Sequence, residues 1–291
     1  MLETKKNLAV YSGLKVEPRP IVKWVGGKGQ LLSQLQPLFP KKFNNYFEPF
    51  LGGGAVFFHL RPSQAHLNDL NKKLIGALES IQTDPEGVIK ILENLQDEFH
   101  SRSPEKQKEL FYFLRNKFNF EKNHKLEKAA ILIFLNKTCF NGMYRENSKG
   151  EFNTPFGSYK NPTILDEENV LAVSDALRNV RLTSLPFENA VEDAKRGDFV
   201  YFDPPYHPLT KTANFTGYHE NDFREDDQIR LSEMFKKLDK KGCYIMLSNS
   251  DTRFIKNLYK GFRIEKVLAN RQINCKATGR GKINELVILN Y

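Results

Sequence analysis

Cysteine is scarce in this chain of 291 residues, and its three cysteines lie far apart with no C-x-x-C pair. This spacing argues against a disulfide framework and a cysteine-rich zinc site, and it is typical of a reducing compartment. Long hydrophobic runs are also lacking, since the longest, residues 129–135, is far too short to span a bilayer. No apolar stretch of signal-peptide length follows the lysines of the N-terminus. We therefore expect a cytoplasmic protein with no membrane partner.

Basic residues outnumber acidic ones, and the excess has a definite location. The net charge is +9, yet residues 43–252 carry −4, while residues 1–42 carry +6 and residues 253–291 carry +7. A basic balance favours a polyanionic partner such as nucleic acid, although many basic proteins bind none. We expect the arginines near the C-terminus, Arg271 and Arg280, to contact phosphates.

Two regions of the chain alternate between strands and helices. The first contains predicted strands at 46–50 and 65–68 with a helix at 55–60 between them. The second begins near residue 180, with predicted strands at 180–184, 199–202, 242–248, 262–268 and 283–290, and helices at 223–238 and 252–259. This alternation predicts an α/β fold with a mainly parallel sheet and crossover helices.

A helical block separates these two regions. Residues 72–136 follow a helical period, with helices expected at 86–99, 104–118 and 126–135, and a loop rich in Gly, Asn and Pro follows at 141–162. We interpret the block as a mostly helical insertion covering residues 72–160. The predicted α/β domain then consists of residues 1–71 and 161–291. Insertions of this kind occur at the strand ends where ligands bind.

A glycine-rich turn follows the first predicted strand. Phe50 and Leu51 lead into Gly52-Gly53-Gly54, and Asp69 stands just after the second strand. Glycines allow a tight turn and a close approach to a ligand, and a carboxylate at Asp69 can accept both hydroxyls of a ribose. Three interpretations stay open here: a nicotinamide dinucleotide, S-adenosylmethionine, or a purely structural turn. The absence of G-x-G-x-x-G counts against the first.

The sequence Asp203-Pro204-Pro205-Tyr206 directly follows an apolar strand. The prolines end the strand ladder and fix φ, so the nearby carbonyl groups are held rigidly. A carboxylate and a fixed carbonyl can accept both hydrogens of the adenine N6 amine, leaving its lone pair aimed at a methyl sulfonium. Methyl transfer is then direct, by positioning and oriented dipoles, without a covalent intermediate or a metal. Tyr206 can stack on a base flipped out of a duplex. The alternative is a strand-ending turn with a core tyrosine.

With these motifs, the chain resembles the Dam-type DNA N6-adenine methyltransferases of the alpha group from about residue 20 to residue 291. The resemblance implies a Rossmann-like sheet that binds S-adenosylmethionine, with an inserted target-recognition domain and the D-P-P-Y motif after it. The blocks that carry it, besides D-P-P-Y, are Lys23-Trp-Val-Gly-Gly-Lys28, Phe47-Glu-Pro-Phe-Leu-Gly-Gly-Gly54, Asn68-Asp69, Asn141-Gly-Met-Tyr-Arg145, Phe152-Asn-Thr-Pro-Phe-Gly157 and Arg280-Gly-Lys-Ile-Asn-Glu285.

The resemblance also implies roles for individual residues. Catalysis falls to Asp203, Pro204, Pro205 and Tyr206. S-adenosylmethionine, which leaves as S-adenosylhomocysteine, is expected to contact Trp24, Lys28, Phe50, Gly52, Gly54, Asp69, Phe187 and Asp203. Pro186 precedes Phe187 where the family often has Asp. No metal is expected.

The DNA-reading residues follow from the same resemblance. Lys23 and Arg145 match positions that contact guanine, and Met143, Pro155 and Tyr159 match the recognition loop. The alternative for Arg145 is a loop salt bridge with Glu146 or Glu151. The family pattern suggests GATC in double-stranded DNA, with adenine methylated; relatives that read longer sites beginning GAT share much of this loop. Residues 215–218 and the acidic stretch 220–227 are expected to close over the flipped base, with Asp226 and Asp227 at the start of the next helix.

The sequence also allows other functions to be considered. A methyltransferase acting on RNA adenine or protein glutamine is disfavoured by Asp at 203 and by the recognition block at 141–160. The intact D-P-P-Y motif argues against a non-catalytic DNA-binding module and against a nicotinamide oxidoreductase, because neither uses this motif. The enzyme fits either the modification partner of a restriction endonuclease, without a stable complex, or a solitary enzyme. We expect a monomer or a weak dimer.

Overall fold

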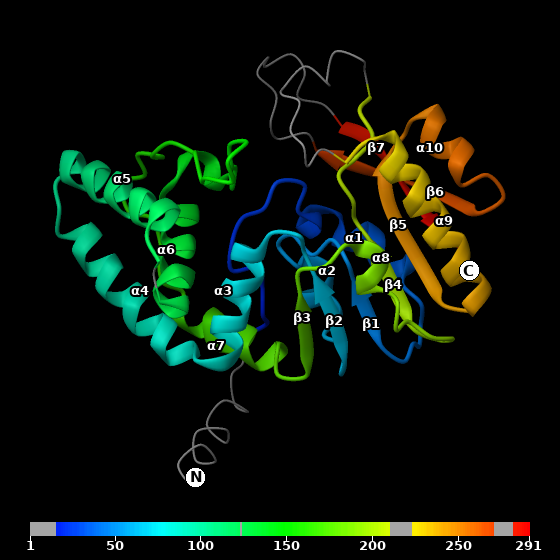
Figure 1. Ribbon diagram of the computed structural model, residues 1–291, viewed down its shortest axis with the longest axis horizontal. Helices are drawn as coiled ribbons and strands as arrows, with labels where there is room; N and C mark the ends of the chain where they lie inside the picture. Colours follow the sequence, from blue (N-terminus) through cyan, green and yellow to red (C-terminus); the bar gives the residue numbers. More distant parts are fainter. Residues whose placement is uncertain (1–15, 123, 210–222, 271–281) are drawn as a thin grey trace, which may run out of the picture. The chain divides into compact units, whose positions relative to one another are not determined.

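The computed structural model describes residues 16–122, 124–209, 223–270 and 282–291 (Figure 1). The chain divides into two compact units. The first unit comprises residues 1–27, 52–61 and 71–182, and the second comprises residues 28–51, 62–70 and 183–291. The predicted boundaries of the insertion, 72 and 160, stay a prediction.

A seven-stranded sheet organises the described part of the chain, in the order β3-β2-β1-β4-β5-β7-β6. Strand β1 pairs in parallel with β2 and with β4, and β4 pairs in parallel with β5. Strand β7 runs antiparallel between β5 and β6. The predicted α/β fold with a mainly parallel sheet is therefore confirmed. The strands are β1 Tyr46–Glu48, β2 Ala65–Asn68, β3 Val180–Thr183, β4 Phe199–Phe202, β5 Tyr244–Ser250, β6 Arg263–Asn270 and β7 Lys282–Leu289.

The strand order creates a switch point at β1. The chain moves from β1 to β2 on one side of the sheet, and β4 later joins the other side of β1. In open α/β sheets, ligands bind beyond the carboxyl ends of the strands at such a point. Every residue of β1, β2 and β4 is buried, as expected for parallel strands covered on both faces.

A hydrophobic core cluster of the second unit joins strands to helices. Residues Val200 and Phe202 of β4 pack with Leu231 and Phe235 of helix α9 (Glu225–Lys241) in that core. Tyr259, which follows helix α10 (Arg253–Leu258), is buried in the same cluster. The unit also contains the short helices α1 (Leu32–Leu35) and α8 (Phe187–Ala190).

Helix α9 begins later than the sequence predicted, at Glu225 instead of residue 223, and it ends later, at Lys241. Its start is fixed by Asp227, whose carboxylate accepts a hydrogen bond from the Arg224 backbone N–H at 2.8 Å. Gly242, with φ of +80°, ends the helix in the left-handed conformation that glycine favours. The expected position of Asp226 and Asp227 at the start of this helix is confirmed, and Asp227 caps it.

The first unit is mostly helical among its described residues. Helix α6 (Lys125–Thr138) is buried along most of its length, and α3, α4 and α5 pack around it. The side chains of Asn71, Asp84 and Ser103 cap the starts of α3, α4 and α5. The remaining bounds are α2 Ala55–Leu60, α3 Lys72–Thr83, α4 Pro85–His100, α5 Pro104–Phe120 and α7 Glu167–Ala176. Helix α3, as a separate element, and α7 were not predicted.

None of the helices in the described ranges combines the length and the apolar character that crossing a bilayer requires.

Candidate active site and recognition loop

Asp203 forms an ion pair with Lys28 in the second unit. The chain leaves β4 at Phe202, and the Asp203 carboxylate then lies 2.8 Å from the Lys28 ammonium. Only 6% of the Lys28 side chain and 18% of the Asp203 side chain are exposed. Burial raises the pKa of the Asp203 carboxyl, and the Lys28 charge acts in the opposite direction. The Lys28 charge therefore opposes the effect of burial on a carboxylate at the end of a central strand.

Tyr206 is held at both its ring and its hydroxyl. The Lys28 ammonium lies over the ring, 4.9 Å from the centroid, and the hydroxyl donates to the Glu285 carboxylate at 2.8 Å. Burial, together with the nearby carboxylates of Asp203 and Glu285, raises the pKa of the Tyr206 hydroxyl, so it stays a donor. Sequence reasoning assigned no role to Glu285. Its placement depends on the antiparallel pairing of β7 with β5, which sets Glu285 opposite Ser250.

Phenylalanines gather beyond the carboxyl ends of β1 and β4. The rings of Phe50 and Phe187 lie 5.5 Å apart, and the Phe223 ring meets Phe50 edge-on at 5.6 Å. The Arg230 guanidinium lies over the Phe187 ring at 5.5 Å. The sequence-predicted cofactor residues Phe50 and Phe187 are thus brought together on one aromatic wall.

Asp69 stands at the same edge of the sheet, fixed by its neighbour Asn68. The buried Asn68 amide donates to the carbonyls of Pro49 and Leu185, both at 3.0 Å. Its oxygen accepts from the Thr183 hydroxyl and the Leu185 N–H, both at 2.8 Å. Asn68 therefore connects the segments that follow β1 and β3 by hydrogen bonds, and the half-buried Asp69 is the next residue in the chain.

Within the first unit, the Trp24 ring lies so close to position 52 that only glycine fits there. A Cβ at Gly52 would lie 2.8 Å from the Trp24 ring, and its φ of +50° is in the left-handed region. The Trp24 ring also stacks on Tyr144, with 4.9 Å between the ring centroids and 15° between the planes. Gly54, with φ of +72°, starts helix α2.

Residues 139–157 form an irregular antiparallel hairpin, which is called the recognition loop here after the role predicted for it from the sequence. The Arg145 guanidinium donates to the Asn153 side chain at 2.8 Å, while the Asn153 N–H donates to the Arg145 carbonyl at 3.0 Å. The Thr154 hydroxyl fixes the Met143 carbonyl at 2.7 Å. Arg145 is exposed and forms no ion pair with any residue in the described ranges, so the alternative of a loop salt bridge with Glu146 or Glu151 is not seen there.

Lys23 is attached to the recognition loop by Asn136. The fully buried Asn136 side chain accepts from the Lys23 N–H at 2.7 Å and donates to the Lys23 carbonyl at 2.9 Å. It also donates to the Gly142 carbonyl at 3.1 Å. A Cβ at Gly142 would lie 2.4 Å from Lys23 Cδ, so the lysine chain passes directly over this glycine, next to Met143. The structure thus brings together residues 23 and 143, which are far apart in sequence.

The other loop residues predicted to read DNA also lie in this unit. Pro155 is exposed, and its carbonyl accepts from the Phe140 N–H at 2.8 Å. The Tyr159 ring packs where Gly157 leaves room, since a Cβ at Gly157 would lie 2.7 Å from it.

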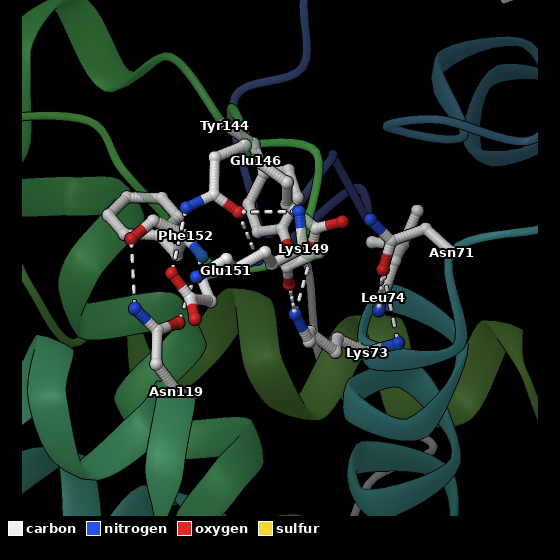
Figure 2. Close-up of polar contacts among 11 residues, drawn as sticks. Asn71, Lys73, Leu74, Asn119, Tyr144, Glu146, Lys149, Glu151 and Phe152 are labelled. Carbon is white, nitrogen blue, oxygen red and sulfur yellow. Dashed lines mark hydrogen bonds and ion pairs between the residues drawn. The ribbon is translucent and has the colours of Figure 1, made fainter. Parts of the chain in front are cut away.

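Helices α3 and α5 brace the loop from below (Figure 2). The Lys73 ammonium of α3 forms an ion pair with Glu146 at 2.7 Å and also donates to the Gly150 carbonyl. Glu146 in turn accepts a hydrogen bond from the Tyr144 hydroxyl. On the α5 side, the Asn119 side chain bonds both the N–H and the carbonyl of Phe152, at 2.9 and 3.0 Å. Sequence reasoning missed these supports because nothing in the helical period of α3 and α5 marks them.

Several sequence-predicted features cannot be placed. Arg271, Arg280 and the segment 215–218 lie outside the described residues. Within the described residues, no group of three or more His, Cys, Asp or Glu side chains is arranged to hold a metal ion.

Comparison with known proteins agrees with the resemblance seen in the sequence. The family model for D12 class N6 adenine-specific DNA methyltransferases matches residues 24–273. A type II methyltransferase of Methanocaldococcus jannaschii, M.MjaIII, is 47% identical over 95% of this chain and all of its own length. A type II methyltransferase of Lactococcus lactis, M1.LlaDCHI, is 45% identical over 95% of this chain and 97% of its own. A DNA adenine methylase of Haemophilus influenzae is 34% identical over 94% of each chain.

Proposed function

Because the chain belongs to the D12 class N6 adenine-specific DNA methyltransferase family, we propose that it transfers the methyl group of S-adenosylmethionine to N6 of an adenine flipped out of double-stranded DNA. The enzyme class expected from the sequence, an adenine-specific DNA methyltransferase, is confirmed by this membership. The observation that carries the proposal for the site is the ion-paired Asp203, which begins D-P-P-Y at the end of β4.

The residues of the second unit fit S-adenosylmethionine. Phe50 and Phe187 offer an apolar aromatic wall suited to an adenine ring, and Asp69 offers a carboxylate suited to ribose hydroxyls at the same sheet edge. The family resemblance adds Trp24, Lys28, Gly52 and Gly54 to the proposed set. When bound, this cofactor supplies an electrophilic methyl group on a sulfonium.

The proposed mechanism assigns the reacting amine to Asp203 and Pro204. The Asp203 carboxylate accepts one N6 hydrogen, and the Pro204 carbonyl accepts the other. Lys28 maintains the ionised acceptor against the effect of burial. Tyr206, fixed by Glu285, offers its ring as a platform for the flipped base. These groups act by position and charge, so they are ready before the substrate arrives.

For the DNA sequence, we propose GATC, read by Lys23 and Arg145 at guanine and by Met143, Pro155 and Tyr159 in the same loop. Lys or Arg bonded to guanine O6 and N7 is the commonest specific base contact. Lys23 lying over Gly142, and Arg145 exposed on a braced hairpin, support this assignment. Residues 72–160 remain our proposed recognition domain. Arg271 and Arg280 are proposed phosphate contacts.

The names of two relatives support a biological role. Both are type II methyltransferases, so we propose that this chain is the modification enzyme of a restriction system. In this proposal it acts as a monomer or a weak dimer and forms no stable complex with the endonuclease.

The test is to express the chain in a host that lacks its own adenine methylase and to map N6-methyladenine by sequencing. We expect methylation of the adenine in GATC, and its loss in Asp203→Ala under conditions in which that variant is still folded. Methylation that survives in Asp203→Ala would contradict the mechanism. Methylation at a longer site beginning GAT would keep the mechanism and replace the proposed specificity.

A further inference from the structure

We infer that Gln228 and Asn249 are positioning residues that hold the D-P-P-Y loop in its reactive conformation; the inference rests on the proposed function. Gln228 lies on α9, and its side-chain N–H donates to the Pro205 carbonyl at 2.9 Å. Asn249, near the end of β5, donates from its side-chain amide to the Gln228 side-chain oxygen at 3.0 Å. The Asn249 oxygen accepts from the His207 backbone N–H at 3.1 Å. The two amides therefore connect a carbonyl on one side of Tyr206 to an N–H on the other.

The direction of each amide is forced by the backbone groups at the two ends of this chain of bonds. The Pro205 carbonyl is an acceptor, so it must meet the nitrogen of Gln228, and the Gln228 oxygen must then face the nitrogen of Asn249. That leaves the Asn249 oxygen for the N–H groups of His207 and Ser250, the latter at 2.9 Å. Neither amide can be reversed without placing like groups together.

Burial makes this arrangement a strong constraint. Gln228 and Asn249 are both 0% exposed. A buried amide that loses its partner has no water to replace it, so the loop cannot shift without an unsatisfied group. Apolar side chains would fill the same space without fixing the direction of the backbone.

The consequence concerns Tyr206 and the carbonyls around it. Gln228 and Asn249 hold the peptide groups on both sides of Tyr206, and the Ser250 hydroxyl holds the next one by donating to the His207 carbonyl at 2.6 Å. The two prolines before it have fixed φ angles. The Pro204 carbonyl is consequently kept at one position relative to the Asp203 carboxylate, as a preorganised acceptor pair requires.

The first test is Gln228→Met, which keeps the length of the side chain and removes both of its hydrogen bonds. Because a misplacement of about 1 Å costs about 100-fold, we expect the single-turnover methylation rate to fall about 10- to 100-fold. Affinity for S-adenosylmethionine, followed by the fluorescence of the single tryptophan Trp24, and affinity for DNA should change by less than about two-fold, as for an interaction used only in the transition state.

Ser232→Ala is the matched control. Ser232 lies one turn along the same helix, is 2% exposed, and donates within the helix to the Ile229 carbonyl. The change therefore removes a buried polar group without touching the D-P-P-Y loop. We expect it to lower stability without lowering the single-turnover rate of the folded protein.

Gln228→Glu gives a signature that a merely structural role does not produce. An ionised glutamate can accept from Asn249 but cannot donate to the Pro205 carbonyl, whereas a protonated one can do both. The rate of this variant relative to wild type should therefore rise as the pH falls. Taking the ratio removes the pH dependence of Asp203, which both proteins share.

Measuring wild type and Asp203→Ala in the same assay distinguishes a failure of the proposed function or mechanism from a failure of the positioning role. If the wild-type protein methylates no adenine, the proposed function is overturned. If methylation survives in Asp203→Ala, the proposed mechanism is overturned and the positioning role with it. If Asp203→Ala is inactive and Gln228→Met has a wild-type rate, the positioning role alone is overturned. Should Gln228→Met fail to fold, the pH ratio of Gln228→Glu decides: a flat ratio overturns the role, and a rising one supports it.

Discussion

Replacing Gly142 by alanine should impair sequence recognition more than stability. The new Cβ would lie 2.4 Å from Lys23 Cδ, whereas carbon atoms rest about 3.5–4.0 Å apart, so the lysine chain must move by more than about 1 Å. The Lys23 backbone cannot move with it, because Asn136 holds both its N–H and its carbonyl. The side chain has to rotate, and its ammonium leaves the place from which we propose that it reads guanine.

Gly142→Ala has two effects, backbone strain at a positive φ and displacement of the Lys23 side chain. Gly150→Ala has only the first, so comparing the two variants separates them. Both glycines have positive φ, +65° and +73°, so alanine at either position costs about 1–2 kcal/mol of stability. A Cβ at Gly150 meets nothing within 4 Å, so no base-reading residue is displaced. Only Gly142→Ala should lose the Lys23 contact, worth about 1–3 kcal/mol of discrimination at one base pair, or about 5- to 150-fold.

The assay compares kcat/KM on a GATC duplex with kcat/KM on duplexes that differ at one base pair. We expect Gly142→Ala to relax the preference at one position and Gly150→Ala to keep it, at a similar loss of thermal stability. In a Lys23→Met background, Gly142→Ala should reduce discrimination no further, because both changes remove the same contact. Unchanged discrimination in Gly142→Ala would refute the reading role of Lys23. An equal loss in both alanine variants would assign the effect to general distortion of the hairpin.

The remaining predictions concern the two sites separately. Lys28→Met removes the charge that opposes the raised pKa of Asp203, so this pKa should rise further and the acid limb of the rate profile should move to higher pH; an unmoved limb would exclude the pairing from catalysis. Tyr144→Leu should change the emission of Trp24 by removing the stack, while Tyr144→Phe should preserve it; equal spectra from the two variants would contradict the stacked geometry. Arg145→Ala should cost about 1–3 kcal/mol at one base pair; a uniform loss across sequences, read from binding titrations, would mark a phosphate contact instead.

The central strands were predictable because their sequence pattern is unambiguous. The strands at 65–68 and 199–202 have the predicted bounds. Residues 199–202 are a continuous apolar run, and turn residues flank both strands. The helical block was less clear. Helix α3 carries its own cap, Asn71, and ends at Thr83, but its apolar residues join those of α4 with only Asp84 between the two helices. The helical period of the sequence therefore runs on from α3 into α4, and it did not show α3 as a separate helix.

The motifs of the site were also visible in the sequence, but their partners were not. Asp203 was recognisable from the prolines beside it, whereas its ion pair with Lys28 depends on where the chain before β1 runs after folding. Likewise, Glu285 reaches Tyr206 only because β7 lies antiparallel beside β5. Contacts between distant segments of this kind follow from topology, which local patterns do not encode.

Buried amides show most clearly that local sequence patterns do not encode contacts between distant segments. Asn136, Gln228 and Asn249 are each 0% exposed, yet in a sequence pattern an amide counts as a surface residue. The predicted helix at 126–135 stopped one residue before Asn136, whereas α6 continues to Thr138. Each of these amides is tolerated in the interior because it bonds backbone groups of a loop, and Gln228 and Asn249 also bond each other. A polar residue within an apolar segment thus identifies a loop that must be held in one conformation, and here the loops so held are the recognition hairpin and D-P-P-Y.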